Sequence, residues 1–203
     1  KYAYYPDDII LEIIKRGNTD DILLLLDKGD VLDEEKTELL LNSENSEAVL
    51  AYIKLISSIN GGICLKDNDI GLIKPCYKDA LKIYLSYSTL SADADIELAK
   101  MNDEELLLIY FNLLARKGFH PYDRASEIIF SLGSLELKHA YVDRLGLPYF
   151  AERQLITNGR YMDIDAVSYI ENYILYPSCE ILLIQNYPFE VVKSYLEQIN
   201  IAE

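Results

Sequence analysis

The sequence repeats one phrase near its C-terminus: ERQLI (152–156) with SYI (168–170), and then EILLI (180–184) with SYL (194–196). In each copy an acidic residue opens an apolar segment, a glycine or asparagine follows, and a tyrosine marks a second apolar segment. Internal similarity at a period of about 20 to 50 residues is the signature of stacked repeat folds. The phrase therefore predicts a repeated supersecondary unit.

Copies of the same phrase occur upstream. EIIF (127–130) precedes AYV (140–142), and ELLL (38–41) precedes AYI (51–53). Weaker copies complete a series of marker positions at Leu26, Tyr52, Tyr84, Tyr110, Tyr141, Tyr169 and Tyr195. Neighbouring markers are 26 to 32 residues apart. This spacing predicts about seven units, with loop insertions between some of them.

The glycine and polar residues between the apolar segments of a unit predict a helix–turn–helix. Gly17, Gly133 and Gly159 follow first segments, where a left-handed glycine can end a helix. Polar residues that could start the second helix are Asp20, Ser46, Asn102, Ser134 and Asn186. Apolar residues of the second segments recur at helical spacing, so we expect an all-α chain without a sheet. Helices of about 10 residues are marginal alone and must be stabilised by neighbouring units.

The third unit departs from the pattern. INGGI (59–63) and KPC (74–76) interrupt it with glycine and proline. We therefore expect a single repeat domain over residues 1–203, with an irregular insertion near 59–78.

The unit resembles the short helical repeats of bacterial HEAT-like or variant leucine-rich repeat proteins, and the resemblance covers nearly the whole chain. It implies a right-handed α-solenoid, an α–α superhelix of about seven repeats. Such repeats are interaction scaffolds without shared catalytic residues. The resemblance therefore implies binding and names no partner.

Charge narrows the class of partner. The formal net charge is −15, which disfavours direct nucleic-acid binding. Residues 1–50 carry 13 acids and 5 bases, whereas residues 51–101 carry 6 of each. The acidity has three interpretations: a solvated outer face of terminal repeats, a surface for a basic partner, or mimicry of nucleic acid.

No apolar run approaches the roughly 20 residues that span a bilayer, and we expect no membrane insertion. The opening residues 1–8 are polar and show no signal peptide, although one could have been removed. The odd set of Cys64, Cys76 and Cys179 is typical of a reducing compartment. These features predict a cytoplasmic protein.

Catalytic and metal-binding motifs are scarce. The histidines are His120 and His139, and no local signature pairs either with a cysteine. DNDIG (67–71) and DADIE (93–97) invite a calcium interpretation but lack the complete ligand spacing of a calcium loop. We interpret both as polar connectors. We accordingly predict no enzyme activity, no cofactor and no bound metal.

Tyrosine is unusually frequent, with 17 residues and no tryptophan. The six marker tyrosines are predicted to pack between helices. Seven others lie off that register, near turns: Tyr87, Tyr122, Tyr149, Tyr161, Tyr173, Tyr176 and Tyr187. Tyrosine and arginine are enriched at binding hot spots. The predicted protein-binding residues are Tyr122, Tyr149, Tyr161, Tyr176, Arg153 and Arg160, and local packing is the alternative for these rings.

Together these features predict a scaffold or adaptor that binds a protein or peptide through its concave or connector face. Two alternatives stay open: an enzyme or small-molecule receptor with a pocket between repeats, and an acidic nucleic-acid mimic. The sequence does not define the oligomeric state.

Overall fold

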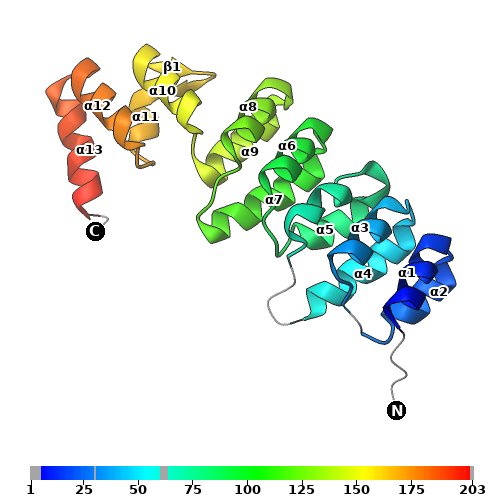
Figure 1. Ribbon diagram of the computed structural model, residues 1–203. Helices are drawn as coiled ribbons and strands as arrows, with labels where there is room; N and C mark the ends of the chain where they lie inside the picture. Colours follow the sequence, from blue (N-terminus) through cyan, green and yellow to red (C-terminus); the bar gives the residue numbers. More distant parts are fainter. Residues whose placement is uncertain (1–5, 30, 60–63, 202–203) are drawn as a thin grey trace. The chain divides into compact units, whose positions relative to one another are not determined.

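The structure, a computed structural model, describes residues 6–29, 31–59 and 64–201 (Figure 1). Helices dominate these residues, as the sequence predicts. The chain divides into two compact units, Lys1–Ala140 and Tyr141–Glu203. Each unit is described by itself below.

The first unit is built from pairs of short helices. In chain order its elements are α1 (Asp7–Arg16), α2 (Thr19–Leu26), α3 (Glu34–Asn42), α4 (Ser46–Ser58), the 3-10 segments η1 (Lys66–Leu72) and η2 (Pro75–Tyr77), α5 (Lys78–Tyr84), α6 (Ala92–Met101), α7 (Glu104–Lys117) and α8 (Asp123–Leu132). The next helix, α9 (Leu135–Leu145), crosses the boundary between the units.

Consecutive pairs pack in two rows. The first row follows α1, α3, η1, α6 and α8, each in contact with the next. The second row follows α2, α4, α5 and α7 in the same way. The rows align equivalent helices of successive repeats, which is how a repeat protein buries a continuous core.

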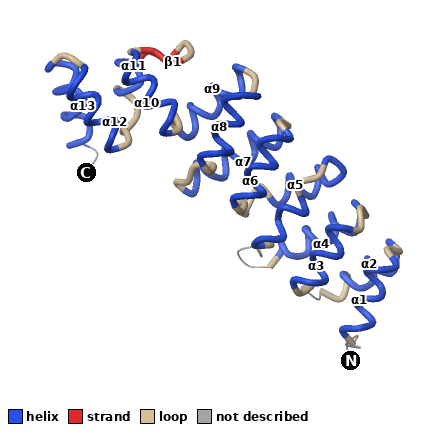
Figure 2. The backbone as a smooth tube through the Cα atoms, turned by 45° about the horizontal axis from the view of Figure 1, so that its top comes forward, coloured by secondary structure: helices blue, strands red, loops and turns tan. Residues whose placement is uncertain are grey.

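The second unit holds α10 (Tyr149–Asn158), α11 (Ala166–Ile170), α12 (Pro177–Asn186) and α13 (Phe189–Ile201). Helices α10 and α12 are in contact as first-row helices. Between α10 and α11 the chain forms an antiparallel hairpin, β1 (Arg160–Tyr161) and β2 (Ile164–Asp165), drawn in red in Figure 2. The expectation of no sheet is therefore wrong at this point. Strands of two residues are too short to show a period in the sequence.

Two of the three predicted glycine caps are confirmed. Gly17 and Gly159 end α1 and α10 in the left-handed conformation, with φ of 67° and 76°. Gly133 differs, because its φ is −65° and its backbone is extended. A Cβ at Gly133 would lie 2.7 Å from the carbonyl oxygen of Ile129, so this position needs a small residue for space.

The predicted helix starts are less accurate. Ser134 is confirmed, since its hydroxyl accepts the N–H of Leu137 at 3.1 Å. Three of the others are displaced by one or two residues: the observed N-caps are Asn18, Asn45 and Asp103. Asn102 instead ends α6 in the left-handed conformation. Asn186 is the last residue of α12.

The marker residues lie in the core, as predicted. Every one of them, from Leu26 to Tyr195, is at most 4% exposed. The hydroxyl groups of marker tyrosines also bind the backbone of connectors. Tyr84 accepts the N–H of Leu65 at 3.0 Å, and Tyr169 accepts that of Leu147 at 2.8 Å. Each of these leucines lies just before a first-row element. The tyrosine therefore joins the second helix of a repeat to the entrance of its first.

The fourth residue of most first-row elements is polar and withdrawn from solvent: Thr37, Asp69, Asp95, Ser126, Glu152 and Glu180. Three of the acids accept the backbone N–H of the residue before the next first-row helix, each at 2.7 Å: Asp69 from Ser91, Asp95 from Tyr122 and Glu152 from Tyr176. We call these bonds the carboxylate clasps. They tie η1 to the start of α6, α6 to the start of α8, and α10 to the start of α12.

The clasps correct the interpretation of the two acidic clusters as connectors. Residues 93–97 lie inside α6, and Asp95 is only 1% exposed. Asp69 lies in η1 and is fully buried. Buried carboxylates must be hydrogen-bonded, and backbone amides of the next repeat fulfil that need. Of the predicted irregular segment 59–78, residues 60–63 lie outside the described residues, while η1 and η2 take the place of a regular first-row helix.

Candidate binding surface

The structure brings together two of the predicted contact residues. Tyr149 begins α10 and Tyr176 precedes α12, and their rings meet edge to face with centroids 5.7 Å apart. Tyr149 is 38% exposed and Tyr176 is half-buried. The pair therefore combines a packing contact with a partly exposed aromatic surface.

The other predicted contact residues are spread over several elements. Arg153 is exposed on α10, and Arg160 and the half-buried Tyr161 form strand β1. Burial raises the pKa of Tyr161. Tyr122 is 53% exposed before α8, in the first unit. The contact surface predicted from these residues stays a prediction.

Two further off-register tyrosines contribute to packing. Tyr173 stacks on Tyr169 with ring centroids 4.5 Å apart, and Tyr87 contacts the ring of Tyr84 edge to face at 5.5 Å. Both rings are half-buried against marker tyrosines. Local packing therefore explains these two.

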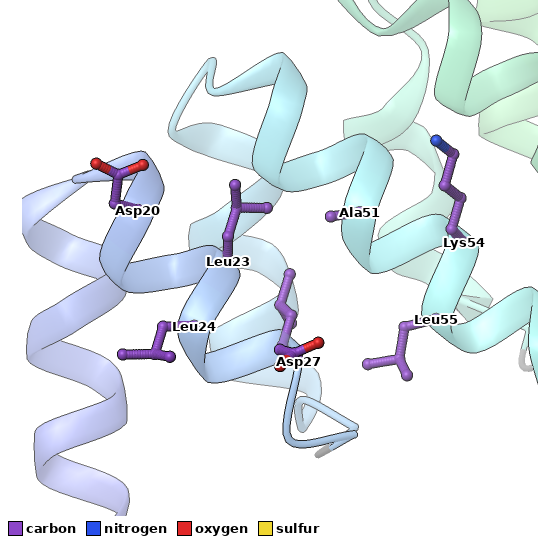
Figure 3. Close-up of a pocket in the computed structure, with 8 residues that line it drawn as sticks. Asp20, Leu23, Leu24, Asp27, Ala51, Lys54 and Leu55 are labelled. Carbon is purple, nitrogen blue, oxygen red and sulfur yellow. The ribbon is translucent and has the colours of Figure 1, made fainter.

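A groove that the sequence analysis did not identify lies between the second-row helices α2 and α4 (Figure 3). Its volume is about 690 Å³. The lining residues are Asp20, Leu23, Leu24, Leu26 and Asp27 from the α2 side and Ala51, Lys54 and Leu55 from α4. This set is the α2–α4 groove. Its centre is apolar and its rim is charged.

The spacing of these residues explains the groove. Positions 20, 23, 24 and 27 fall on one face of α2, as do positions 51, 54 and 55 on α4. Leu24 is 59% exposed and Leu23 is half-buried, whereas Leu25 and Leu26 of the same helix are buried. Ala51 leaves space on the opposite wall, where a longer side chain would fill it. The spacing of the groove residues on α2 is visible in the sequence. The role of Ala51 is not, because it depends on packing between repeats.

The charged residues of the groove are unpaired. Within the described part of the chain, no ion pair or side-chain hydrogen bond involves the carboxylates of Asp20 and Asp27 or the ammonium group of Lys54. All three side chains are exposed. They are therefore available to a partner.

The neighbouring second-row junction is different. Lys78 and Lys82 of α5 face Asp103 and Glu105 at the start of α7. The Lys78 ammonium lies 2.6 Å from Asp103, and the Lys82 ammonium lies 2.7 Å from Glu105. These hydrogen bonds raise the pKa of Lys78 and lower the pKa of Glu105. The charges of the α5–α7 junction are thus satisfied within the protein.

A second groove has a similar construction in the other unit. It lies between α11 and α13, with a volume of about 200 Å³. Val167, Ile170 and Val191 line it together with the carboxylates of Glu171 and Glu190. Acidic residues beside an apolar surface therefore recur between second-row helices.

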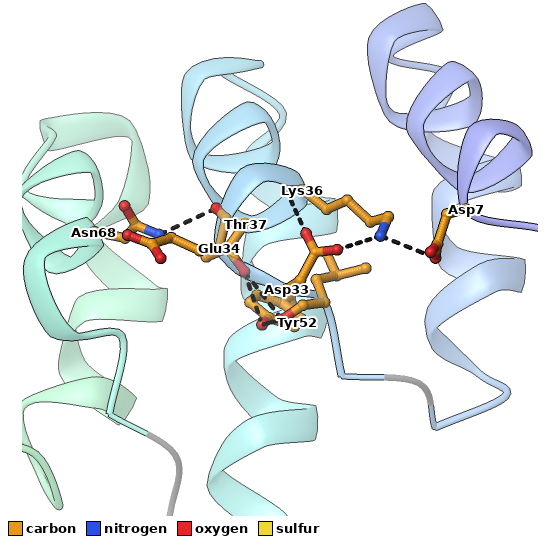
Figure 4. Close-up of polar contacts among 8 residues, drawn as sticks. Asp7, Asp33, Glu34, Lys36, Thr37, Tyr52 and Asn68 are labelled. Carbon is orange, nitrogen blue, oxygen red and sulfur yellow. Dashed lines mark hydrogen bonds and ion pairs between the residues drawn. The ribbon is translucent and has the colours of Figure 1, made fainter.

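Among the described residues, the most buried lysine, Lys36, stabilises the fold. The Lys36 ammonium forms ion pairs with Asp33 and, at 3.1 Å, with Asp7 of α1, so it links α1 to α3 (Figure 4). The hydrogen bond with Asp33 raises the pKa of Lys36, and the same bond lowers the pKa of Asp33. Beside it, the hydroxyl groups of Thr37 and Tyr52 are 3.1 Å apart.

The buried carboxylates have altered acidity. Burial raises the pKa of Asp95 to about 7 and that of Glu152 to about 7. Such values occur in general acids and bases, but here both groups bind backbone amides of the next repeat. Burial also raises the pKa of the Cys179 thiol to about 12, which leaves it protonated and weakly nucleophilic at neutral pH. The geometry is that of structural clasps.

In the ranges that the structure describes, no group of three or more His, Cys, Asp or Glu side chains is arranged to hold a metal ion. No described helix has the length and apolarity needed to cross a membrane. No family model matches the sequence, and the comparisons with curated proteins and with solved structures give no match.

Proposed function

We propose that this protein is a protein- or peptide-binding scaffold whose second-row helices form the binding face. The α2–α4 groove is the observation that carries the proposal, because it combines exposed leucine with unpaired charge. Binding sites are typically concave and apolar with a few polar groups that fix orientation. The groove has that composition, and its charged side chains form no ion pair with any other described residue.

The proposal includes the architecture that the repeat resembles. The two rows support a right-handed α-solenoid of the HEAT-like or variant leucine-rich type, as found in bacterial proteins. Free Cys64, Cys76 and Cys179 support work in the cytoplasm, where thiols stay reduced. The net charge of −15 supports a basic partner.

Affinity capture from the source cell with quantitative mass spectrometry tests the proposal. The bait is the full chain, compared with Leu24→Glu, which places a charge in the apolar centre of the groove. The matched control is Ile181→Glu on the first-row helix α12, because Ile181 is 57% exposed and Leu24 is 59% exposed. We expect at least one protein to be captured by the wild type and by the control but lost with Leu24→Glu. Identical captures by all three baits would contradict the proposal.

A further inference from the structure

The α2–α4 groove also indicates the chemistry of its partner, an inference that rests on the proposed function. Its apolar centre is formed by Leu23 and Leu24 on α2 and by Ala51 and Leu55 on α4. Figure 3 shows these residues on the two helices that flank the space. Two adjacent helix faces that expose leucine are the usual receptor for the apolar face of a third helix.

The spacing of the acidic residues predicts the spacing of basic residues in a partner. Asp20 and Asp27 are seven residues apart on the same face of α2, which corresponds to about 10 Å along a helix axis. Leu23 and Leu24 lie between them. A helix lying along α2 can present basic side chains at the same spacing, seven positions apart, with leucines between them.

Lys54 distinguishes the two walls. It is the charged lining residue on the α4 side, whereas those on the α2 side are acidic. A partner with basic residues on one flank of its apolar face and an acidic residue on the other would match both walls. The opposite arrangement would bring like charges together on both flanks, which weakens binding.

We propose that the α2–α4 groove binds one amphipathic helix of a partner protein, with a leucine-rich face and two basic residues seven positions apart. The arginine or lysine side chains lie against Asp20 and Asp27. Leucine side chains fill the space above Ala51 between Leu23 and Leu55.

Fluorescence anisotropy with a designed probe tests this inference. The probe is a fluorescein-labelled helical peptide of about 18 residues with a leucine face and two arginines at the stated spacing. Its matched control replaces both arginines with glutamate. The receptor is the full chain, with Ala51→Leu as a variant that fills the groove without changing charge. Circular dichroism checks that each variant remains folded.

We expect the arginine peptide to bind in the micromolar range and the glutamate peptide at least about tenfold more weakly. Ala51→Leu should weaken the arginine peptide by at least about tenfold, because the apolar face loses its site. The double change of Asp20→Asn with Asp27→Asn should weaken it about three- to tenfold, as expected for exposed ion pairs. Ile181→Glu should leave binding unchanged.

Equal binding of the two peptides, or binding that Ala51→Leu does not affect, would overturn the inference. Self-association of the chain in sedimentation experiments that Leu24→Glu abolishes would also overturn it, because a second copy would then cover the groove. These failures are separable from failure of the proposed function. If the peptides fail while Leu24→Glu still loses a captured protein, the binding role stands and only the helix chemistry is wrong.

Discussion

The α2–α4 groove and the α5–α7 junction are formed by the same row of helices but have opposite surface chemistry. At the junction, lysines on α5 meet carboxylates on α7, and Lys78 to Asp103 is one of several close ion pairs. At the groove, acids on α2 face Ala51 and a lysine that does not reach them. The arrangement of the helices therefore does not by itself decide the chemistry of the surface between two second-row helices. Side-chain pairing decides whether it is closed or open to a partner.

Local charge balance explains the difference. Residues 51–160, which contain both sides of the junction, carry 14 acids and 13 bases, whereas residues 1–50, which contain α2, carry 13 acids and 5 bases. The acids of residues 1–50 therefore outnumber the bases of the same segment by eight. A basic partner would supply the compensating charge, which is why the groove is a better candidate for binding than the junction.

The largest expected effect separates the shared core from the open groove. Tyr84→Ala removes a fully buried ring from α5 and should lower the free energy of unfolding by about 3–5 kcal/mol. Leu24→Ala removes a side chain that is 59% exposed and should change it by less than about 1 kcal/mol. Urea titration followed by circular dichroism measures both. A comparable loss for Leu24→Ala would mean that the leucine belongs to the core and that the groove is not an open surface.

Asp95 differs from the paired carboxylates of the junction and from the exposed carboxylates of the groove, because it is buried. Its pKa is raised from 3.8 to about 7, so the folded state holds its proton over a range where the unfolded state has lost it. This contribution to stability is full below about pH 4 and is lost as the pH rises to about 7.

Asp95→Asn should remove that dependence while keeping an oxygen to accept the Tyr122 N–H. The wild-type free energy of unfolding minus that of the variant should therefore fall by about 2–3 kcal/mol between pH 5 and pH 8. Urea titrations at unit pH steps measure it. A difference that is constant with pH would show that the clasp does not titrate in this range.

The next effect tests the closed junction. The Asp103 carboxylate accepts the N–H of Leu106 at 3.2 Å as the N-cap of α7 and also pairs with Lys78. Asp103→Ala should therefore cost about 1 kcal/mol of stability, the usual effect of losing an N-cap. Asp27→Asn, its counterpart at the groove, loses no partner within the described residues and should leave the melting temperature nearly unchanged. If Asp27→Asn lowered the melting temperature as much as Asp103→Ala, the groove acids would belong to the fold.

The sequence predicted the parts of this molecule that repeat. The marker tyrosines predicted the second-row helices and their burial, because a large ring at a fixed register has one place to pack. The hairpin at 160–165 could not be predicted, since two-residue strands show no alternation. Asp95 was misread because an acidic residue in a local acidic cluster suggests solvent, while its amide partner Tyr122 lies 27 residues away.

The candidate site was harder to predict than the fold. The i, i+3, i+4, i+7 stripe from Asp20 to Asp27 could have drawn attention to α2. The groove also needs Ala51, and an alanine in a helix carries no signal until its neighbours are known. The tyrosines near the turns carried a stronger signal from composition, but Tyr87 and Tyr173 pack against marker tyrosines. The frequency of tyrosine indicated that aromatic rings would be exposed. The groove could not be predicted, because it depends on which side chains face each other across two repeats.

The smallest expected effect on stability is the most direct test of the comparison. Leu24→Lys would place a cation four residues after Asp20 and three before Asp27, so that α2 pairs its own acids much as the α5–α7 junction does. Acid–lysine pairs at these spacings add about 0.2–0.5 kcal/mol each to a helix, and the lost leucine is largely exposed. The melting temperature should therefore change little. Binding of the arginine peptide should fall by at least about tenfold. Asp20 and Asp27 are then paired with the new lysine, and the peptide loses its apolar contact with Leu24. Undiminished peptide binding by a folded Leu24→Lys variant would show that an open, acid-rimmed surface is not what distinguishes the groove from the junction.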